Sequence, residues 1–133
     1  MRFLLQTAGL GQLLLAFGSL LIPRILHWPE DLAKLKTLTR QVFWTYALYI
    51  WSTNIFFGAM SLFAADWLLD SSPATRALTG YIAAYWGVRL GAQLFYLDRS
   101  AAPPGLIFKV AEVALVLLFT FLTLVYGYAT LFR

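Results

Sequence analysis

Two charged residues stand inside long apolar segments, and they are the first candidates for chemistry. Arg89 lies in a run from Ala77 to Leu97 that holds no other charge, and Glu112 lies in the apolar segment that follows. Even the mildest scale gives a cost of about 2.5–3.5 kcal/mol for a charged side chain at the centre of a membrane-spanning helix. We therefore expect each of these residues to have a partner or a function.

An ion pair between the two would satisfy both charges. Arg89 precedes Leu97 by eight residues, and Glu112 follows Leu106 by six. With a rise of 1.5 Å per residue, both backbones lie about 9–12 Å from the same face of the membrane. The short connection makes these helices antiparallel neighbours. We predict an ion pair between Arg89 and Glu112 that fixes the register of the two helices.

A ligand site is the alternative hypothesis for the same residues. Tyr85, Arg89 and Gln93 recur at helical spacing on one face, and the preceding apolar segment offers Tyr49 and Asn54 as companions. In this interpretation Arg89 lines a cavity that opens to the cytoplasmic leaflet. It binds an anionic headgroup or a carboxylate there.

Other strips of small and polar residues are expected to hold helices together. Small residues let membrane helices approach closely, and polar residues bond across the interface. We predict that these strips pack inside a helical bundle. They comprise Ala8, Gln12, Ala16 and Ser19 near the N-terminus and Gln41, Thr45, Tyr49 and Ser52 in the second apolar segment.

The residue types needed for other chemistries are missing. The chain has no cysteine and one histidine, His27, so thiol chemistry and a haem held by two histidines of one chain are excluded. No G-x-S-x-G motif is present. Small multidrug exporters carry a membrane-embedded glutamate in their first helix, where this chain has only Gln12. We expect no catalytic set, no metal site and no cofactor.

The composition explains why these residues must be judged against a bilayer. Hydrophobic residues make up 61% of the 133 residues and charged residues 12%, against about 25% charged in a typical soluble domain. Residues 3–23, 41–65 and 113–132 carry no charge, and about 20 apolar residues suffice to cross the hydrocarbon core. These runs are continuously apolar, unlike the alternating strands of a membrane barrel, so helices are favoured.

We therefore predict an all-α, polytopic membrane protein with one domain, an antiparallel bundle of four transmembrane helices. The spans are expected at about residues 4–25, 40–69, 74–97 and 106–131. The first is longer than the apolar region of a signal peptide and no A-x-A cleavage pattern follows it, so we expect it to be retained.

A short interfacial helix is expected at about residues 29–39. Pro29 suits a first helical turn, and Glu30 and Asp31 favour its N-terminal end. This segment is either an outward extension of the second span or a docking surface for a partner or for anionic headgroups. The residues of that surface are Trp28, Lys34, Lys36 and Arg40.

The basic residues predict an orientation, because Lys and Arg concentrate in cytoplasmic loops. They also account for the net charge of +4 without a nucleic-acid partner. Six lie between the first and second or the third and fourth spans, and three lie on the other side, so both termini are predicted to be non-cytoplasmic. The six are Arg24, Lys34, Lys36, Arg40, Arg99 and Lys109; the three are Arg2, Arg76 and Arg133.

Aromatic residues at both ends of the spans are expected to form belts at the two membrane surfaces, where Trp and Tyr are favoured. These belts comprise Trp28, Trp44 and Tyr46 on the cytoplasmic side and Trp67, Tyr126 and Tyr128 on the other.

Three hypotheses about function follow from these patterns. The leading hypothesis is a non-enzymatic accessory or scaffold subunit that packs in the lipid bilayer against a larger complex or against a second copy. The alternative is a binder or carrier of a small amphiphile or anion at Arg89. An enzyme acting on lipids is the third and least supported.

Overall fold

The computed structural model describes residues 2–70, 72–96 and 105–131, and every element in these ranges is helical. The prediction of an all-α protein is therefore confirmed. Leu97, Arg99 and Arg133, which entered the predictions of spans and orientation, lie outside the described residues. The elements are α1 (Arg2–Gly18), η1 (Ser19–Leu21), α2 (Ile22–Ile25), α3 (Trp28–Leu32), α4 (Thr37–Phe63), α5 (Ala65–Leu68), α6 (Pro73–Phe95) and α7 (Leu106–Leu131).

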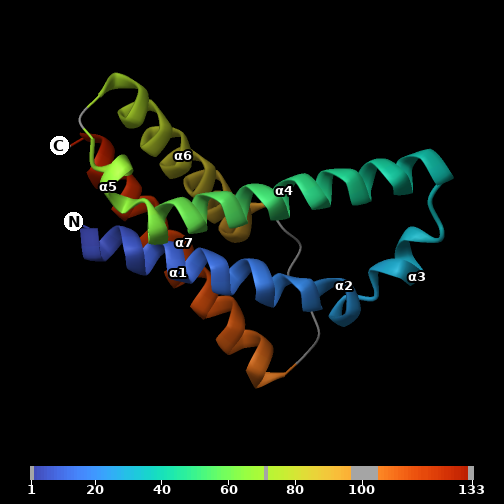
Figure 1. The fold of residues 1–133 in the computed structure, drawn as a ribbon. Coiled ribbons are helices and arrows are strands. Elements are labelled where there is room, and N and C mark those ends of the chain that lie inside the picture. Colours follow the sequence, from blue (N-terminus) through green and yellow to red (C-terminus); the bar gives the residue numbers. More distant parts are fainter. Residues whose placement is uncertain (1, 71, 97–104, 132–133) are drawn as a thin grey trace.

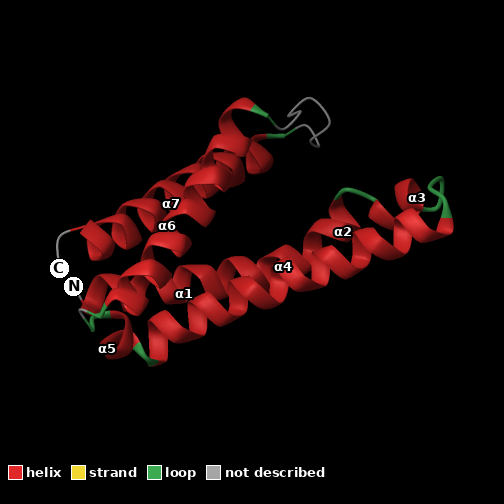
Figure 2. Cartoon of the chain, turned by 90° about the horizontal axis from the view of Figure 1, so that it is seen from above, coloured by secondary structure: helices red, strands yellow, loops and turns green. Residues whose placement is uncertain are grey.

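The long helices form two antiparallel hairpins, α1 with α4 and α6 with α7 (Figure 1). The hairpins meet beside α5 and both chain termini, and from there they diverge (Figure 2). We call the meeting point the closed end. The opposite end, with α2, α3 and the first turns of α4 and α7, is the open end.

The first hairpin bends where a proline interrupts the helix. Pro23 has no backbone N–H to donate to residue 19, so the chain passes through the 3₁₀ turn η1 before α2. His27 then adopts a left-handed conformation, with φ of 56°. This reverses the chain into α3.

The interfacial segment differs from its prediction. We expected one helix over about 29–39, but α3 ends at Leu32 and α4 begins at Thr37. Lys36 has ψ of 148°, which is extended and stops helical hydrogen bonding at that point. Residues 37–39 therefore belong to the long helix α4.

The second hairpin begins with a capped turn. The chain breaks at Ala64, forms α5, and enters α6 at Ser72. The Ser72 hydroxyl accepts a hydrogen bond from the Thr75 backbone N–H at 3.3 Å, and Pro73 occupies the first turn of α6. Both features are favoured at helix N-termini.

Two stretches of helix are long and apolar enough to cross a membrane by length and composition. They are Arg2–Ile25, which joins α1 to α2, and Leu106–Leu131, which is α7. Among the described residues α4 and α6 fall short of the same criterion. The reason in α4 is its many Ser, Thr, Asn and Gln residues, and in α6 it is Arg76 and Arg89 among many Gly, Ala, Tyr and Trp residues of low hydropathy. That all four long helices cross a membrane is therefore a proposal.

The main cluster of buried residues lies towards the closed end. It contains residues from both hairpins and from α5. Residues 37–54 of α4 and 106–118 of α7 contain no buried residue, although Leu115 and Leu118 pack against the edge of the cluster. The hairpins are thus joined over part of their length only. The core includes Leu5, Ala8, Phe57, Ala65, Leu68, Ile82, Trp86, Phe119, Leu122, Val125 and Tyr126.

Two glycines let α1 and α4 cross closely in this core. A Cβ atom on Gly9 would lie 2.6 Å from the Gly58 backbone oxygen and 2.7 Å from the Leu62 backbone nitrogen. Backbone atoms cannot move aside as a flexible side chain does. The crossing therefore requires glycine at position 9.

Gly9→Ala should force the two helices apart and lower the free energy of unfolding by about 1–3 kcal/mol, the usual cost of overpacking. Gly18→Ala is the matched control, because nothing lies within 4 Å of a Cβ at that position, and alanine gains about 1 kcal/mol of helix propensity over glycine. Thermal unfolding in detergent, followed by circular dichroism, measures both. Equal melting temperatures for the two variants would contradict the close crossing.

Candidate functional site

A hydrogen-bonded cluster of four buried polar side chains lies where the hairpins meet. We call it the polar junction: Gln12 of α1, Ser61 of α4, Trp86 of α6 and Tyr126 of α7. The Gln12 Nε2 donates to the Tyr126 hydroxyl at 2.6 Å, and the Trp86 Nε1 donates to the Gln12 Oε1 at 3.0 Å. The Ser61 and Tyr126 hydroxyls share a further hydrogen bond.

The polar junction holds the fold together. Gln12, Ser61 and Tyr126 are fully buried and Trp86 is 2% exposed. In the part of the chain that is described, every buried side-chain nitrogen and oxygen has a hydrogen-bond partner. A satisfied buried network stabilises one arrangement of the helices, because any other arrangement leaves polar groups without partners in an apolar interior.

The position of one of these residues differs from its prediction. Tyr126 was expected in the outer aromatic belt, and this is wrong, because its side chain is fully buried in the core. The sequence feature that indicated a buried polar cluster was Gln12, since an amide in a charge-free run needs both donors and acceptors nearby.

Arg89 finds its partners on α6 and α7. Its Nη1 donates to the Gln93 Oε1 at 3.1 Å. The guanidinium carbon lies 4.8 Å from the centre of the Phe119 ring, and this ring stacks on Trp86 with centroids 5.5 Å apart. A cation over an aromatic face is stabilised by about 0.5–2 kcal/mol, most strongly where water is excluded. The half-buried charge is thus accommodated by a ring and an amide.

The register of α6 and α7 separates Arg89 from its expected partner. Phe119, which lies beneath the guanidinium, is seven residues from Glu112, or about 10 Å along α7. The ion pairs among the described residues are Arg2–Asp66 at 3.6 Å and His27–Glu30 at 3.7 Å. The expected depth of Arg89 was counted from residue 97, which lies outside the described residues, and that of Glu112 from Leu106.

Of the other residues predicted for a ligand site, Tyr85 and Asn54 lie together and Tyr49 lies apart from them. The Tyr85 hydroxyl donates to the Asn54 Oδ1 at 2.6 Å and ties α6 to α4. Its ring packs edge-on against Phe57 at 5.4 Å. Tyr49 was expected beside them, but it is 62% exposed on the outer surface of α4. The structure therefore brings Tyr85, Asn54, Arg89 and Gln93 to the facing sides of α4, α6 and α7 and leaves Tyr49 out.

Tyr49 belongs to an outward polar strip on α4. Its four members were predicted to pack inside the bundle, and each of them is exposed. The Thr45 hydroxyl is satisfied by the Gln41 backbone oxygen at 2.8 Å, but the Gln41 amide and the Tyr49 hydroxyl face outward. We call Gln41, Thr45, Tyr49 and Ser52 the α4 strip.

The predicted docking residues gather at the open end. Trp28 packs edge-on against Phe43 and Trp44, with ring centroids 5.1 and 5.9 Å away. Lys34 and Lys36 are exposed in the turn beside them, and Arg40 is half-buried in the second turn of α4. This is an aromatic cluster next to a basic turn, as expected of a segment at a membrane surface.

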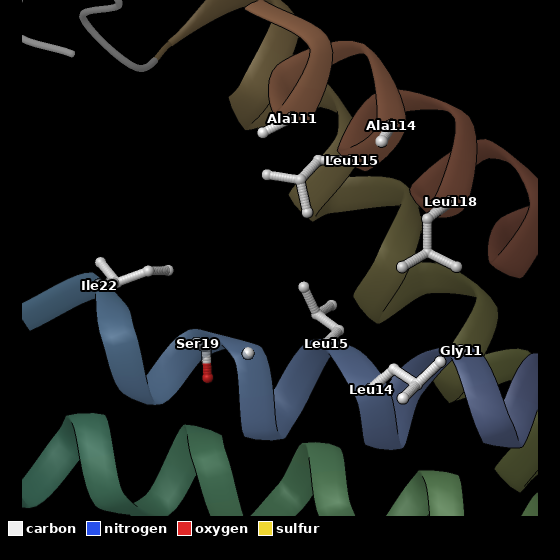
Figure 3. A pocket seen from close by; sticks show the side chains of 10 residues that line it. Gly11, Leu14, Leu15, Ser19, Ile22, Ala111, Ala114, Leu115 and Leu118 are labelled. Carbon is white, nitrogen blue, oxygen red and sulfur yellow. The ribbon is translucent and has the colours of Figure 1, made fainter. Parts of the chain in front are cut away.

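An apolar groove separates the hairpins towards the open end and has a volume of about 530 Å³. Figure 3 shows Leu15 of α1 and Leu115 of α7 pointing toward each other across it. The groove is narrow beside Gly11 and Leu118, where a Cβ on Gly11 would lie 3.0 Å from the leucine Cδ1. Its lining is Gly11, Leu14, Leu15, Gly18, Ser19, Ile22, Ala111, Ala114, Leu115 and Leu118, and Arg89 is not part of it.

Comparisons of the chain with protein-family models, with curated proteins and with solved structures find no match. Within the described ranges no three His, Asp or Glu residues come together as metal ligands. The function is therefore argued from geometry alone.

Tyr126→Phe should lower the free energy of unfolding by about 1–3 kcal/mol, because it removes the hydroxyl that joins Gln12 to Ser61 and leaves buried polar groups without it. Tyr81→Phe is the control, since Tyr81 is 61% exposed. Chemical or thermal unfolding in detergent distinguishes them. A control as destabilised as Tyr126→Phe would show that the polar junction is not special.

Double-mutant cycles test the partners of Arg89. Arg89→Met combined with Phe119→Leu should show a coupling energy of about 0.5–2 kcal/mol, the range for a cation over an aromatic ring. Arg89→Met combined with Glu112→Gln should be additive within about 0.5 kcal/mol, because the side chains belong to different turns. A larger coupling energy between Arg89 and Glu112 than between Arg89 and Phe119 would support the ion pair expected from the sequence instead.

Proposed function

We propose that this protein is a non-enzymatic integral membrane subunit that crosses the bilayer with four helices and serves as an accessory or scaffold. It binds transmembrane helices of a larger complex, or of a second copy, through the α4 strip. The exposure of that strip is the observation that carries the proposal.

The lengths of α4 and α6 support four spans. With 27 and 23 residues they measure about 40 and 35 Å, enough for a hydrocarbon core about 30 Å thick. Much of the polarity of α6 is satisfied internally, since Thr79 and Gln93 are buried and Arg89 lies over Phe119. Each hairpin then crosses the bilayer twice.

The α4 strip then lies at membrane depth with its polar groups outward. Residues 41–63 of α4 contain no charge, so we assign them to the membrane-embedded part of this helix. An amide or hydroxyl facing hydrocarbon is unfavourable, and polar residues of membrane helices bond across helix interfaces. A partner helix that supplies donors and acceptors to Gln41, Tyr49 and Ser52 removes this cost.

The anion-binding alternative is less well supported by the geometry. It required Arg89 to line a cavity, whereas its guanidinium lies against Gln93 and Phe119. The groove between the hairpins is lined by other residues. Arg89 is better explained as a packing residue of the α6–α7 hairpin.

Photo-crosslinking tests the α4 strip. The photoreactive residue benzoylphenylalanine at position 49 should form a protein adduct in native membranes, whereas the same residue at position 50 should form little. Ile50 is the control, because it lies on the same helix, is 53% exposed, and points about 100° away from Tyr49 around the helix axis. The mass of the adduct distinguishes a second copy from another subunit.

A further variant tests whether the adduct depends on the polar side chains of the α4 strip. Gln41→Leu with Ser52→Ala should weaken the adduct from position 49, since it removes the bonding groups while keeping an apolar helix. Equal adducts from positions 50 and 49, or crosslinks to lipid alone, would refute the proposed partner surface.

A further inference from the structure

The groove between the hairpins has the dimensions of an acyl-chain site. Its volume of about 530 Å³ lies within the range of about 300–1,000 Å³ typical of small-molecule pockets. Along the first hairpin it runs from Gly11 to Ile22, a distance of about 16 Å at the helical rise. One leaflet of the hydrocarbon core is about 15 Å thick. The groove therefore matches one leaflet in depth.

The shape of the groove favours a lipid tail over a helix. A helix with its side chains keeps a width of about 10 Å along its whole length. The groove tapers until side chains of α1 and α7 meet at Gly11 and Leu118. A single hydrocarbon chain can follow such a taper, whereas a helix cannot.

Among the described residues of the open end, basic residues outnumber the acidic Glu30, Asp31 and Glu112, and this excess favours an anionic headgroup. Arg24 follows the last lining residue, Ile22, by two positions and is exposed. Lys34 and Lys36 lie exposed in the neighbouring turn, and Lys109 is exposed in the first turn of α7. Basic residues at a membrane surface attract anionic lipid. Headgroup and tail requirements therefore meet at the same end of the molecule.

We propose that the groove between α1 and α7 binds one anionic phospholipid of the open-end leaflet, with an acyl chain between the hairpins and its phosphate near Arg24. This site rests on the bilayer-spanning part of the proposed function and is independent of the α4 strip, which lies on a different helix. The lipid would fill the space where the hairpins do not touch.

Native mass spectrometry tests this site. The full chain is reconstituted in vesicles with equal amounts of phosphatidylglycerol and phosphatidylcholine of identical acyl chains, and is then extracted in mild detergent. One phosphatidylglycerol per chain should remain bound in preference to phosphatidylcholine. Arg24→Gln should reduce that preference about fivefold, the contribution of one basic residue near an anionic leaflet. Arg2→Gln, which removes a charge at the closed end, should leave it unchanged.

Substitutions that fill the groove provide a second test of lipid binding. Ala114→Trp should abolish retention of the lipid, and Val113→Trp should not, because Val113 is 58% exposed and lies outside the groove. If Ala114→Trp fails to fold, Gly18→Leu fills the same space from a position with nothing within 4 Å of its Cβ.

Three results would overturn the lipid site. They are equal retention of the two lipids, equal losses from Ala114→Trp and Val113→Trp, and a dimer of the chain that Ala114→Trp disrupts. The Gln41→Leu, Ser52→Ala variant separates this site from the partner surface, since it should lose its crosslink and keep its lipid.

Discussion

The hydrogen bonds among Gln12, Ser61, Trp86 and Tyr126 hold the two hairpins of this protein together. In a bilayer, apolar side chains gain little by leaving lipid for protein, so helices associate through close packing and interhelical polar bonds. The polar junction draws one residue from each long helix, and the crossing at Gly9 and Gly58 brings two of those backbones into contact. The mutual position of the two hairpins depends on this cluster and on the apolar core around it.

The open end follows from having the junction at one end only. Beyond it the hairpins diverge, and three features lie in the part of the molecule that they do not cover: the apolar groove, the α4 strip and the basic turn beside Trp28. Each of them presents a surface that a bilayer or a partner can satisfy. The closed end is thus structural, and the interactions that we propose concentrate in the open arms. Arg89 lies against Phe119, beside the junction residue Trp86, and extends the junction towards the open end.

Helix positions could be predicted from the sequence more accurately than helix rotations. Charge-free runs and their flanking prolines place α7 at Leu106–Leu131 and α6 at Pro73–Phe95, close to the expected spans. Periodicity also grouped Gln41, Thr45, Tyr49 and Ser52 on one face. It could not show that this face turns outward, because a polar face of a membrane helix can bond to helices of its own bundle or to a separate partner. Tyr126 was misplaced because α7 is apolar almost all round and carries no signal for its inner side. Arg89 and Glu112 were matched by depth, which fails when the register between two helices is unknown. The span predictions for α4 and α6 remain proposals, since their polar content is high for a hydropathy criterion.

The distance between the hairpins at their two ends tests this arrangement most directly. The chain has no cysteine, so pairs of spin labels can be placed cleanly, at Phe3 and Leu131 for the closed end and at Ile25 and Leu106 for the open end. All four side chains are exposed. Double electron–electron resonance in bilayers should give one short, narrow distance at the closed end and a longer one at the open end. Equal distances at both ends would show a parallel-sided bundle and contradict a fold held together at the polar junction.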